Sequence, residues 1–252
     1  MYRELLDFDS IYKFINECDI EEYKYIILPQ IDYNLNIAEL GLKGEYGVSI
    51  GKAILSENPD EVFTKIKAYT ASASEARMCG CEAPVIINSG SGNQGISSSV
   101  PIIVYAKEKN ISEEKLIRAL LFSNLLNIKQ KYKIGTLSAF CGIVCSCGSS
   151  LAGITYLETN DKSKVIKTLK NHLATAPGII CDGAKASCAA KITIALESAI
   201  LAHKLALNNY QYENNTGILK DDIDATIDIV GEIGSKGMQE TDNSIIKALL
   251  KE

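Results

Sequence analysis

Eight cysteines are the residues of this 252-residue sequence best suited to metal or redox chemistry, and only two histidines accompany them. Thiolates can hold zinc or iron–sulfur clusters, act as nucleophiles, or simply fill small core spaces. The spacing lacks the repeated C-x2-C pairs of a structural zinc site, whereas cluster ligands can come from distant positions. Disulfides are the weaker alternative in a chain expected to be cytoplasmic. Spacing alone therefore leaves cluster ligands and core residues open for Cys18, Cys79, Cys81, Cys141, Cys145, Cys147, Cys181 and Cys188.

The last two cysteines, Cys181 and Cys188, are separated by a turn signal. They are seven positions apart, which would place both on one face of a continuous helix. Asp182-Gly183 interrupts that helix, so we expect Cys181 on a loop and Cys188 in the first turn of the next helix. A helix N-terminus favours the thiolate form that metals bind.

A glycine-rich segment, GSGNQG at residues 90–95, formally matches the dinucleotide fingerprint G-x-G-x-x-G. That site also needs a preceding strand and an unbroken following helix, and Pro101 is expected to break or kink the helix. Glycines and neutral donors suit a small carboxylate instead, although such a loop can also merely turn the chain. The candidate substrate-binding residues here are Ser89, Ser91, Gly92, Asn93 and Gln94.

Arg77 lies shortly before this loop in the sequence. A guanidinium can bind a substrate carboxylate through two parallel hydrogen bonds. The alternative is a surface ion pair with Glu75, two residues away.

The elements that must position these residues are predicted to be helices. Segments 83–106 and 134–157 contain no Asp, Glu, Lys or Arg, and their many Gly, Ser and Ala residues favour buried, closely packed segments over membrane spans. Strand-like patterns are short, at residues 25–28 and 85–87. The sequence therefore predicts an all-α or strongly α-rich single domain over residues 1–252, with amphipathic helices near residues 5–20, 112–126, 187–208, 221–233 and 242–250.

Composition excludes several classes of function. The chain is 46% hydrophobic and 23% charged, with a net charge of −5 and no basic run. This balance argues against nucleic-acid binding and against an anionic membrane surface. The first residues lack the apolar core of a signal peptide, so a cytoplasmic protein is expected.

Three segments resemble the iron–sulfur-dependent L-serine dehydratase alpha-chain superfamily, and within it most closely the L-cysteine desulfidase branch. They are ASASEARMCGCEAPVIINSGSGNQGISSSVPIIVYAKE at residues 71–108, LSAFCG at 137–142 and PGIICDGAKASCAAKI at 177–192. Weaker agreement at residues 40–55 and 238–246 extends the resemblance over nearly the whole chain.

The resemblance implies a [4Fe-4S] cluster held by Cys141, Cys181 and Cys188, with one iron open to substrate. Residues 89–95 would then line an amino-acid pocket, and the remaining cysteines would be packing residues or bystanders. The implied reaction is β-elimination, a lyase reaction of amino-acid catabolism that converts L-cysteine to pyruvate, ammonia and sulfide. L-serine dehydratase is the alternative activity.

The resemblance departs from the family in one respect. Desulfidase-type members carry an additional N-terminal region with a cysteine proposed for proton transfer, and nothing in the first 40 residues matches it. A separate N-terminal-half (beta) chain or a homo-oligomer is therefore expected, or else the chain is a non-catalytic cluster-bearing subunit that needs a partner.

Candidate acid–base groups near the expected ligands are Asp182 and Lys185, for which the alternative is a structural role in the turn. A pyridoxal phosphate Schiff base on Lys185 or Lys191 would support the same elimination, but no surrounding motif indicates it and we expect none. His172 is predicted in a loop and His203 on a helix surface.

Overall fold

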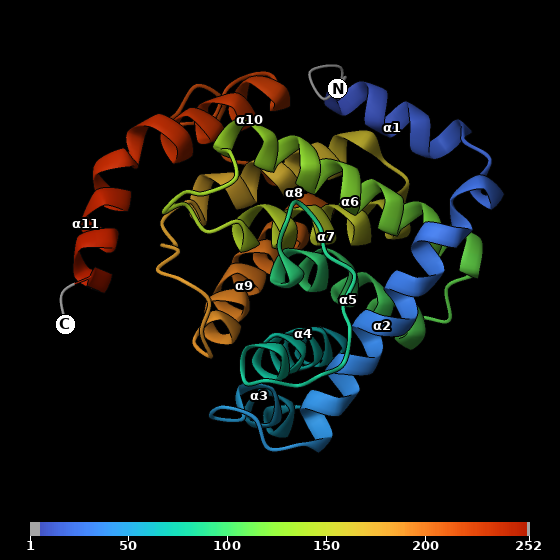
Figure 1. Cartoon of the computed structure of the whole chain (residues 1–252). Coiled ribbons are helices and arrows are strands. Elements are labelled where there is room, and N and C mark those ends of the chain that lie inside the picture. The colour runs from blue at the N-terminus through green and yellow to red at the C-terminus, as the bar shows by residue number, and fades with distance from the viewer. Residues whose placement is uncertain (1–5, 251–252) are drawn as a thin grey trace.

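Helices build nearly all of the protein (Figure 1). The computed structural model describes residues 6–250, and within them the expected all-α class is confirmed, with two isolated β-bridges and no strand. The elements are α1 (Phe8–Glu17), the 3-10 turn η2 (Ile20–Tyr23), α2 (Lys24–Lys43), α3 (Ile50–Glu57), α4 (Val62–Met78), α5 (Gly92–Glu108), α6 (Glu113–Ile134), α7 (Ile143–Thr159), α8 (Lys162–Thr175), α9 (Cys188–Leu207), α10 (Ile223–Glu232), the π turn η3 (Ile233–Gly237) and α11 (Gln239–Leu250).

Helix α7 lies at the centre, where it packs against α5, α6, α8 and α9 (Figure 1). Every residue from Ile143 to Tyr156 is buried, as the charge-free segment predicted. Its small residues let neighbouring helices approach closely; a Cβ on Gly148, for example, would lie 2.5 Å from Cδ2 of His172. A charged or larger side chain in the buried part of α7 would therefore disrupt its packing against these helices.

Helix α5 corrects one expectation. It continues through Pro101, which therefore does not break the helix as the sequence predicted. Proline removes one backbone hydrogen bond, but all residues from Gly92 to Ala106 are buried, and the surrounding helices hold the segment in place. No strand precedes α5 in the described chain, so the dinucleotide-binding arrangement is absent there.

Both predicted strands are wrong. Residues 25–28 form the first turns of α2, where Ile27 is buried. Residues 85–87 are extended but have no partner strand, because the side chain of Asn34 takes that place: its Oδ1 accepts from the Ile86 N–H at 2.8 Å and its Nδ2 donates to the Ile86 carbonyl at 3.2 Å. Tertiary contacts thus override the local preference of β-branched residues.

The predicted amphipathic helices are present as α1, α6, α9, α10 and α11, with ends that differ from prediction by a few residues; residue 5 lies outside the described chain. Their buried faces, with those of the other packed helices, share one cluster of core side chains. Helix α11 instead projects from the body and buries no side chain (Figure 1). None of the helices in residues 6–250 combines the length and apolar character that a membrane crossing requires.

The two histidines also differ from prediction. His172 lies within α8 and His203 within α9, and neither side chain is exposed. His172 bonds the Val144 carbonyl through Nε2 at 2.8 Å, and His203 bonds Thr155 Oγ1 through Nδ1 at 2.8 Å. Ser198 Oγ, 3.2 Å from Nδ1, is the second partner of His172, whereas Nε2 of His203 lies 3.6 Å from Oε2 of Glu158 and makes no hydrogen bond in the described residues. Both side chains are fully buried, so both histidines are core residues.

Candidate functional site

A short antiparallel bridge brings two of the candidate ligand cysteines together. Phe140 pairs with Ile180, the Cys141 N–H donates to the Ile179 carbonyl at 3.0 Å, and the Cys181 N–H donates to the Ala139 carbonyl at 2.7 Å. The interaction between the two thiols lowers the pKa of Cys181 to about 6 and raises the pKa of Cys141, so Cys181 is the thiol that ionises more readily.

Cys188 opens helix α9, and Cys181 lies on the preceding loop, as the turn signal predicted. The Cys188 thiol donates to the Gly183 carbonyl at 3.7 Å. Cys188 is also a minor cause of the raised pKa of Cys141, so the three cysteines lie in the same region of the molecule. In residues 6–250 no three Cys, His, Asp or Glu side chains are close enough to hold a metal without adjustment. The donor set fits iron–sulfur chemistry, and closing it would require the Cys188 thiol to turn toward the other two.

The remaining cysteines lie elsewhere. Cys145 and Cys147 are fully buried in α7, where burial raises the pKa of Cys145 to about 12 and raises that of Cys147 as well. Cys79 is exposed at the end of α4, and Cys18 is partly buried after α1. Buried thiols held neutral in this way are suited to packing.

The glycine loop is a tight turn that leads into α5. Asn88 and Ser91 exchange two backbone hydrogen bonds, at 3.2 and 3.0 Å. Ser89 and Gly90 between them adopt left-handed backbone angles, with φ of 49° and 80°. Ser91 is the N-cap residue of α5, and its Oγ accepts from the Gln94 N–H at 3.4 Å. The loop therefore holds Ser89 in a conformation that is uncommon outside glycine.

A buried network of amide side chains fixes this loop against α6. Asn88 Nδ2 donates to Asn124 Oδ1 at 2.8 Å, and Asn127 Nδ2 donates to Asn88 Oδ1 at 2.9 Å. The Asn127 amide also lies 3.5 Å from Gln94 Oε1. Our sequence analysis missed Asn88, Asn124 and Asn127; the available signal was amides at helical spacing inside the apolar pattern of α6.

Gln94 connects the loop to the cysteine region. A Cβ on Gly142 would lie 2.6 Å from Cδ of Gln94, so the amide rests directly against the residue that follows Cys141. Arg77 packs over the start of α5 in the same way, because a Cβ on Gly92 would lie 2.3 Å from its Nε. Glycine at both positions leaves room for these side chains, and the contacts bring the loop, the guanidinium and the Cys141 segment together.

The alternative ion pair between Arg77 and Glu75 is not formed. Glu75 is buried, and its carboxylate accepts from the backbone N–H groups of Val48 at 2.8 Å and Ile50 at 2.9 Å. In residues 6–250 no carboxylate lies within ion-pair distance of Arg77. The partly buried guanidinium is thus available to an anionic ligand.

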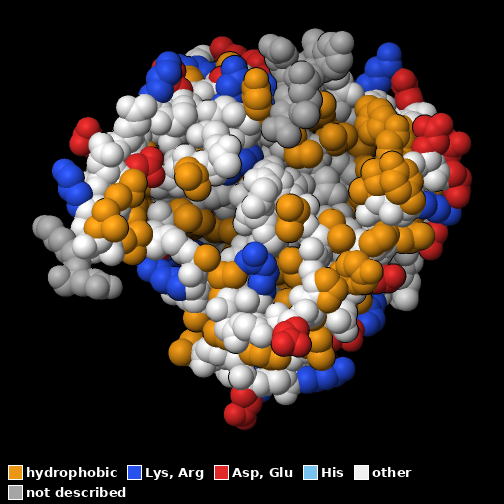
Figure 2. Space-filling view, in the orientation of Figure 1, with side chains coloured by type: hydrophobic (Ala, Val, Ile, Leu, Met, Phe, Trp, Pro, Cys, Tyr) orange, Lys and Arg blue, Asp and Glu red, His pale blue; other side chains and the backbone are white. Residues whose placement is uncertain are grey.

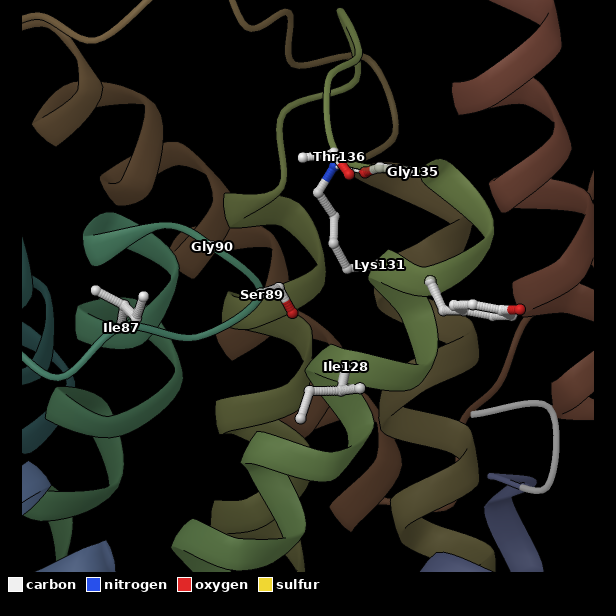
Figure 3. A pocket seen from close by; sticks show the side chains of 8 residues that line it. Ile87, Ser89, Gly90, Ile128, Lys131, Gly135 and Thr136 are labelled. Carbon is white, nitrogen blue, oxygen red and sulfur yellow. Dashed lines mark hydrogen bonds between the residues drawn. The ribbon is translucent and has the colours of Figure 1, made fainter. Parts of the chain in front are cut away.

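A pocket of about 520 Å³ opens between the glycine loop and the C-terminal end of α6 (Figure 3). Ser89 and Gly90 face Ile128 and Lys131 across it. The pocket is large enough for a small amino acid, and its lining is mixed. The lining residues are Ile87, Ser89, Gly90, Ile128, Lys131, Tyr132, Gly135 and Thr136.

Asp182 and Lys185 form an ion pair in the segment between Cys181 and Cys188, and Lys191 of α9 joins the same carboxylate. The two lysines hold the pKa of Asp182 down at about 2. Lys191 also donates to the Ile180 carbonyl at 2.8 Å. An ionised carboxylate with two cationic partners is a weak proton acceptor, and this geometry favours positioning of the segment.

The comparisons with known proteins agree over nearly the full chain. Residues 7–247 match the family described as serine dehydratase alpha chain. A protein described as "UPF0597 protein" from Treponema denticola is 47% identical over 99% of this chain, and one from Lachnoclostridium phytofermentans is 47% identical over 98%. This chain covers 59% of the length of each of these relatives. No solved structure matches.

Proposed function

Because the chain belongs to the serine dehydratase alpha-chain family, we propose that it is a lyase subunit for [4Fe-4S]-dependent β-elimination on a small amino acid, with L-cysteine as the substrate. The reaction breaks the Cα–H and Cβ–S bonds, forms the Cα=Cβ bond of aminoacrylate and releases sulfide. Aminoacrylate tautomerises to an imine, and water then releases ammonia and leaves pyruvate.

One observation carries the proposal: the backbone bridge between Phe140 and Ile180 that brings Cys141 and Cys181 together shortly before the start of α9. Three thiols on two loops and a helix N-terminus are suited to a cluster that keeps one iron free of protein ligands. Cys141, Cys181 and Cys188 would hold the cluster, which when bound supplies a Lewis acid for the leaving group.

The chain's own residues bind and orient the substrate in this proposal. Ser89, Gly92 and Asn93 form the loop wall, and Gln94 spans from this wall to Gly142. Arg77, with no carboxylate partner in the described residues, supplies positive charge next to Gly92. The Asp182–Lys185 pair, with Lys191, holds the segment between two of the ligands.

Two alternatives keep the same site. Water as the leaving group would make the chain an L-serine dehydratase alpha subunit; iron–thiolate affinity favours cysteine. The chain would instead be a non-catalytic subunit if the remaining part of the enzyme must come from a separate N-terminal-half (beta) chain. The relatives support this possibility, because this chain spans only 59% of their length.

Anaerobic reconstitution with iron and sulfide tests the ligand assignment. We expect the protein to gain a broad visible absorption and about four irons per chain. Cys141→Ser, Cys181→Ser and Cys188→Ser should each lose most of this signal, whereas Cys79→Ser, at an exposed position outside the site, should keep it. Full retention of iron in all three ligand variants would contradict the assignment.

Product assays on the reconstituted protein then distinguish the activities. Sulfide released from L-cysteine and pyruvate formed from L-serine are measured with and without a second chain. This second chain is the part of the Treponema denticola relative that the present chain does not match. Faster turnover of L-cysteine supports the proposal, and faster turnover of L-serine supports the dehydratase. Failure with both substrates in both conditions supports the non-catalytic subunit.

A further inference from the structure

Lys131 is a buried cation without a carboxylate partner in residues 6–250. Its side chain belongs to a residue that is only 7% exposed, and its one hydrogen bond goes to the Gly135 carbonyl, 2.6 Å from Nζ. Burial lowers the pKa of its ammonium, while the thiols of Cys145, Cys181 and Cys141 and the carboxylate of Asp242 act in the opposite direction at longer range. None of these groups forms an ion pair with Lys131, so the buried ammonium is free to pair with an anion that enters from the pocket.

The position of Lys131 fits such an anion. It is the charged residue of the 520 Å³ pocket, which Ser89 and Gly90 bound on the opposite side (Figure 3). The rest of the lining is apolar or carries hydroxyl groups. A small organic anion can therefore reach Lys131 without competition from a protein carboxylate within 4 Å in the described chain.

Asn127 adds an independent observation one helical turn before Lys131, on the same face of α6. The residue is fully buried and its amide nitrogen donates to Asn88, but its Oδ1 has no hydrogen-bond partner. The same amide nitrogen lies 3.5 Å from Oγ of Ser89, which lines the pocket. An amide oxygen without a partner in the described residues thus lies behind the part of the pocket wall that Ser89 forms.

We propose that Lys131 binds the carboxylate of a small amino acid in this pocket. The assignment rests on the proposed function for the substrate class. It also gives α6 a role in recognition that the resemblance did not assign to it. The competing explanation is structural: Lys131 would serve only to cap the C-terminal end of α6 through the Gly135 carbonyl.

Binding of three matched probes separates these explanations. L-serine carries both charged groups, ethanolamine lacks the carboxylate, and 3-hydroxypropionate lacks the ammonium. Ligand-observed NMR measures each dissociation constant on the full chain. Lys131→Gln keeps a donor for the Gly135 carbonyl but removes the charge, and Lys133→Gln, at an exposed position two residues on, is the matched control.

We expect Lys131→Gln to weaken binding of L-serine and 3-hydroxypropionate at least tenfold and to change ethanolamine binding less than twofold. Lys133→Gln should change none of the three. Equal weakening of all three probes by Lys131→Gln, unchanged L-serine binding, or no binding to the wild-type chain would each overturn the proposal. If Lys131→Gln does not fold by circular dichroism, Lys131→Arg is compared with Lys131→Met, and only the arginine variant should retain L-serine binding.

The binding test of Lys131 and the test of the proposed β-elimination can succeed or fail independently. Binding that depends on Lys131 in a chain that turns over neither amino acid supports the recognition site and contradicts the reaction. Turnover with a KM for L-cysteine or L-serine that Lys131→Gln leaves unchanged supports the reaction and overturns the role of Lys131.

Discussion

The two kinds of buried basic side chain in this protein behave differently at the residue scale. Both ring nitrogens of His172 have internal partners, whereas His203 bonds Thr155 through Nδ1 and its Nε2 lies 3.6 Å from a Glu158 carboxylate oxygen. Within residues 6–250 Lys131 has a backbone carbonyl as its only hydrogen-bond partner, and it lies at a pocket. Burial by itself therefore does not identify a functional residue. A buried charge that has no ion-pair partner and lies at a cavity open to ligands does.

Stability between pH 7 and pH 5 should depend on His172. Burial lowers its pKa to about 4, against about 6.5 in the unfolded chain, so the unfolded state binds more protons in this interval. The contribution to stability is therefore present above pH 6.5 and is lost as the pH falls toward 4. From these two values we expect a loss of about 2 kcal/mol between pH 7 and pH 5.

Urea unfolding of the wild type and of His172→Gln at both pH values measures this term. The variant should be less stable at pH 7, because it disturbs the bond to Val144, but its stability should fall by about 2 kcal/mol less on acidification. An identical pH dependence in the two proteins would contradict the assignment, because the carboxylates that also titrate are common to both.

At the scale of elements, backbone contacts decide how the helices meet. A Cβ on Gly41 of α2 would lie 2.3 Å from the Ser72 carbonyl oxygen of α4, and a Cβ on Gly51 of α3 would lie 1.9 Å from the Ser72 hydroxyl. Both glycines thus let α2 and α3 close on the same turn of α4. The buried segment of α4 then leads to Arg77, so this packing also positions a candidate substrate-binding residue.

Gly41→Ala should destabilise the fold. Alanine gains about 1 kcal/mol in helix propensity, but overpacking costs about 1–3 kcal/mol and the upper end applies, because backbone atoms cannot rotate away. The expected net loss is about 2 kcal/mol in the free energy of unfolding, measured by urea denaturation. Gly178→Ala, where a Cβ meets nothing within 4 Å, should cost nothing. Equal effects at the two positions would argue against close helix packing as the cause.

At the scale of the whole molecule, apolar side chains remain exposed around the candidate site. Leu137 is 92% exposed beside the pocket-lining Thr136, and Ile87, itself a lining residue, is 59% exposed. Other apolar side chains gather over the side of the molecule where α2 runs (Figure 2). The relatives contain further sequence equal to about two-fifths of their length, which could cover such surfaces.

Leu137→Gln should weaken association with the part of the Treponema denticola relative that this chain does not match. The stability of the chain itself should be unchanged. An exposed side chain contributes less than about 0.5 kcal/mol to folding. Burial of a leucine in an interface is worth about 1.5 kcal/mol or more, which corresponds to a loss of about tenfold in affinity. Calorimetric titration measures this affinity. The control is Leu201→Gln, because Leu201 of α9 is also exposed. Equal weakening by both variants would contradict a partner seated at the site.

The sequence by itself determined the helical class, the burial of the helical parts of the two charge-free segments, in α5 and α7, and the placement of Cys181 before, and Cys188 at, the start of α9. These follow from periodicity and turn signals, which act over a few residues. Resemblance, rather than spacing, selected Cys141 as their companion.

Only the tertiary structure decided what lies between distant segments. It showed that Asn34 replaces a partner strand for Ile86, that both histidines are core residues, and that Lys131 has no carboxylate partner in residues 6–250. Each fact depends on contacts between helices far apart in the chain. Periodicity shows which face of a helix is buried, but only packing determines what that face meets and which polar groups remain without a partner.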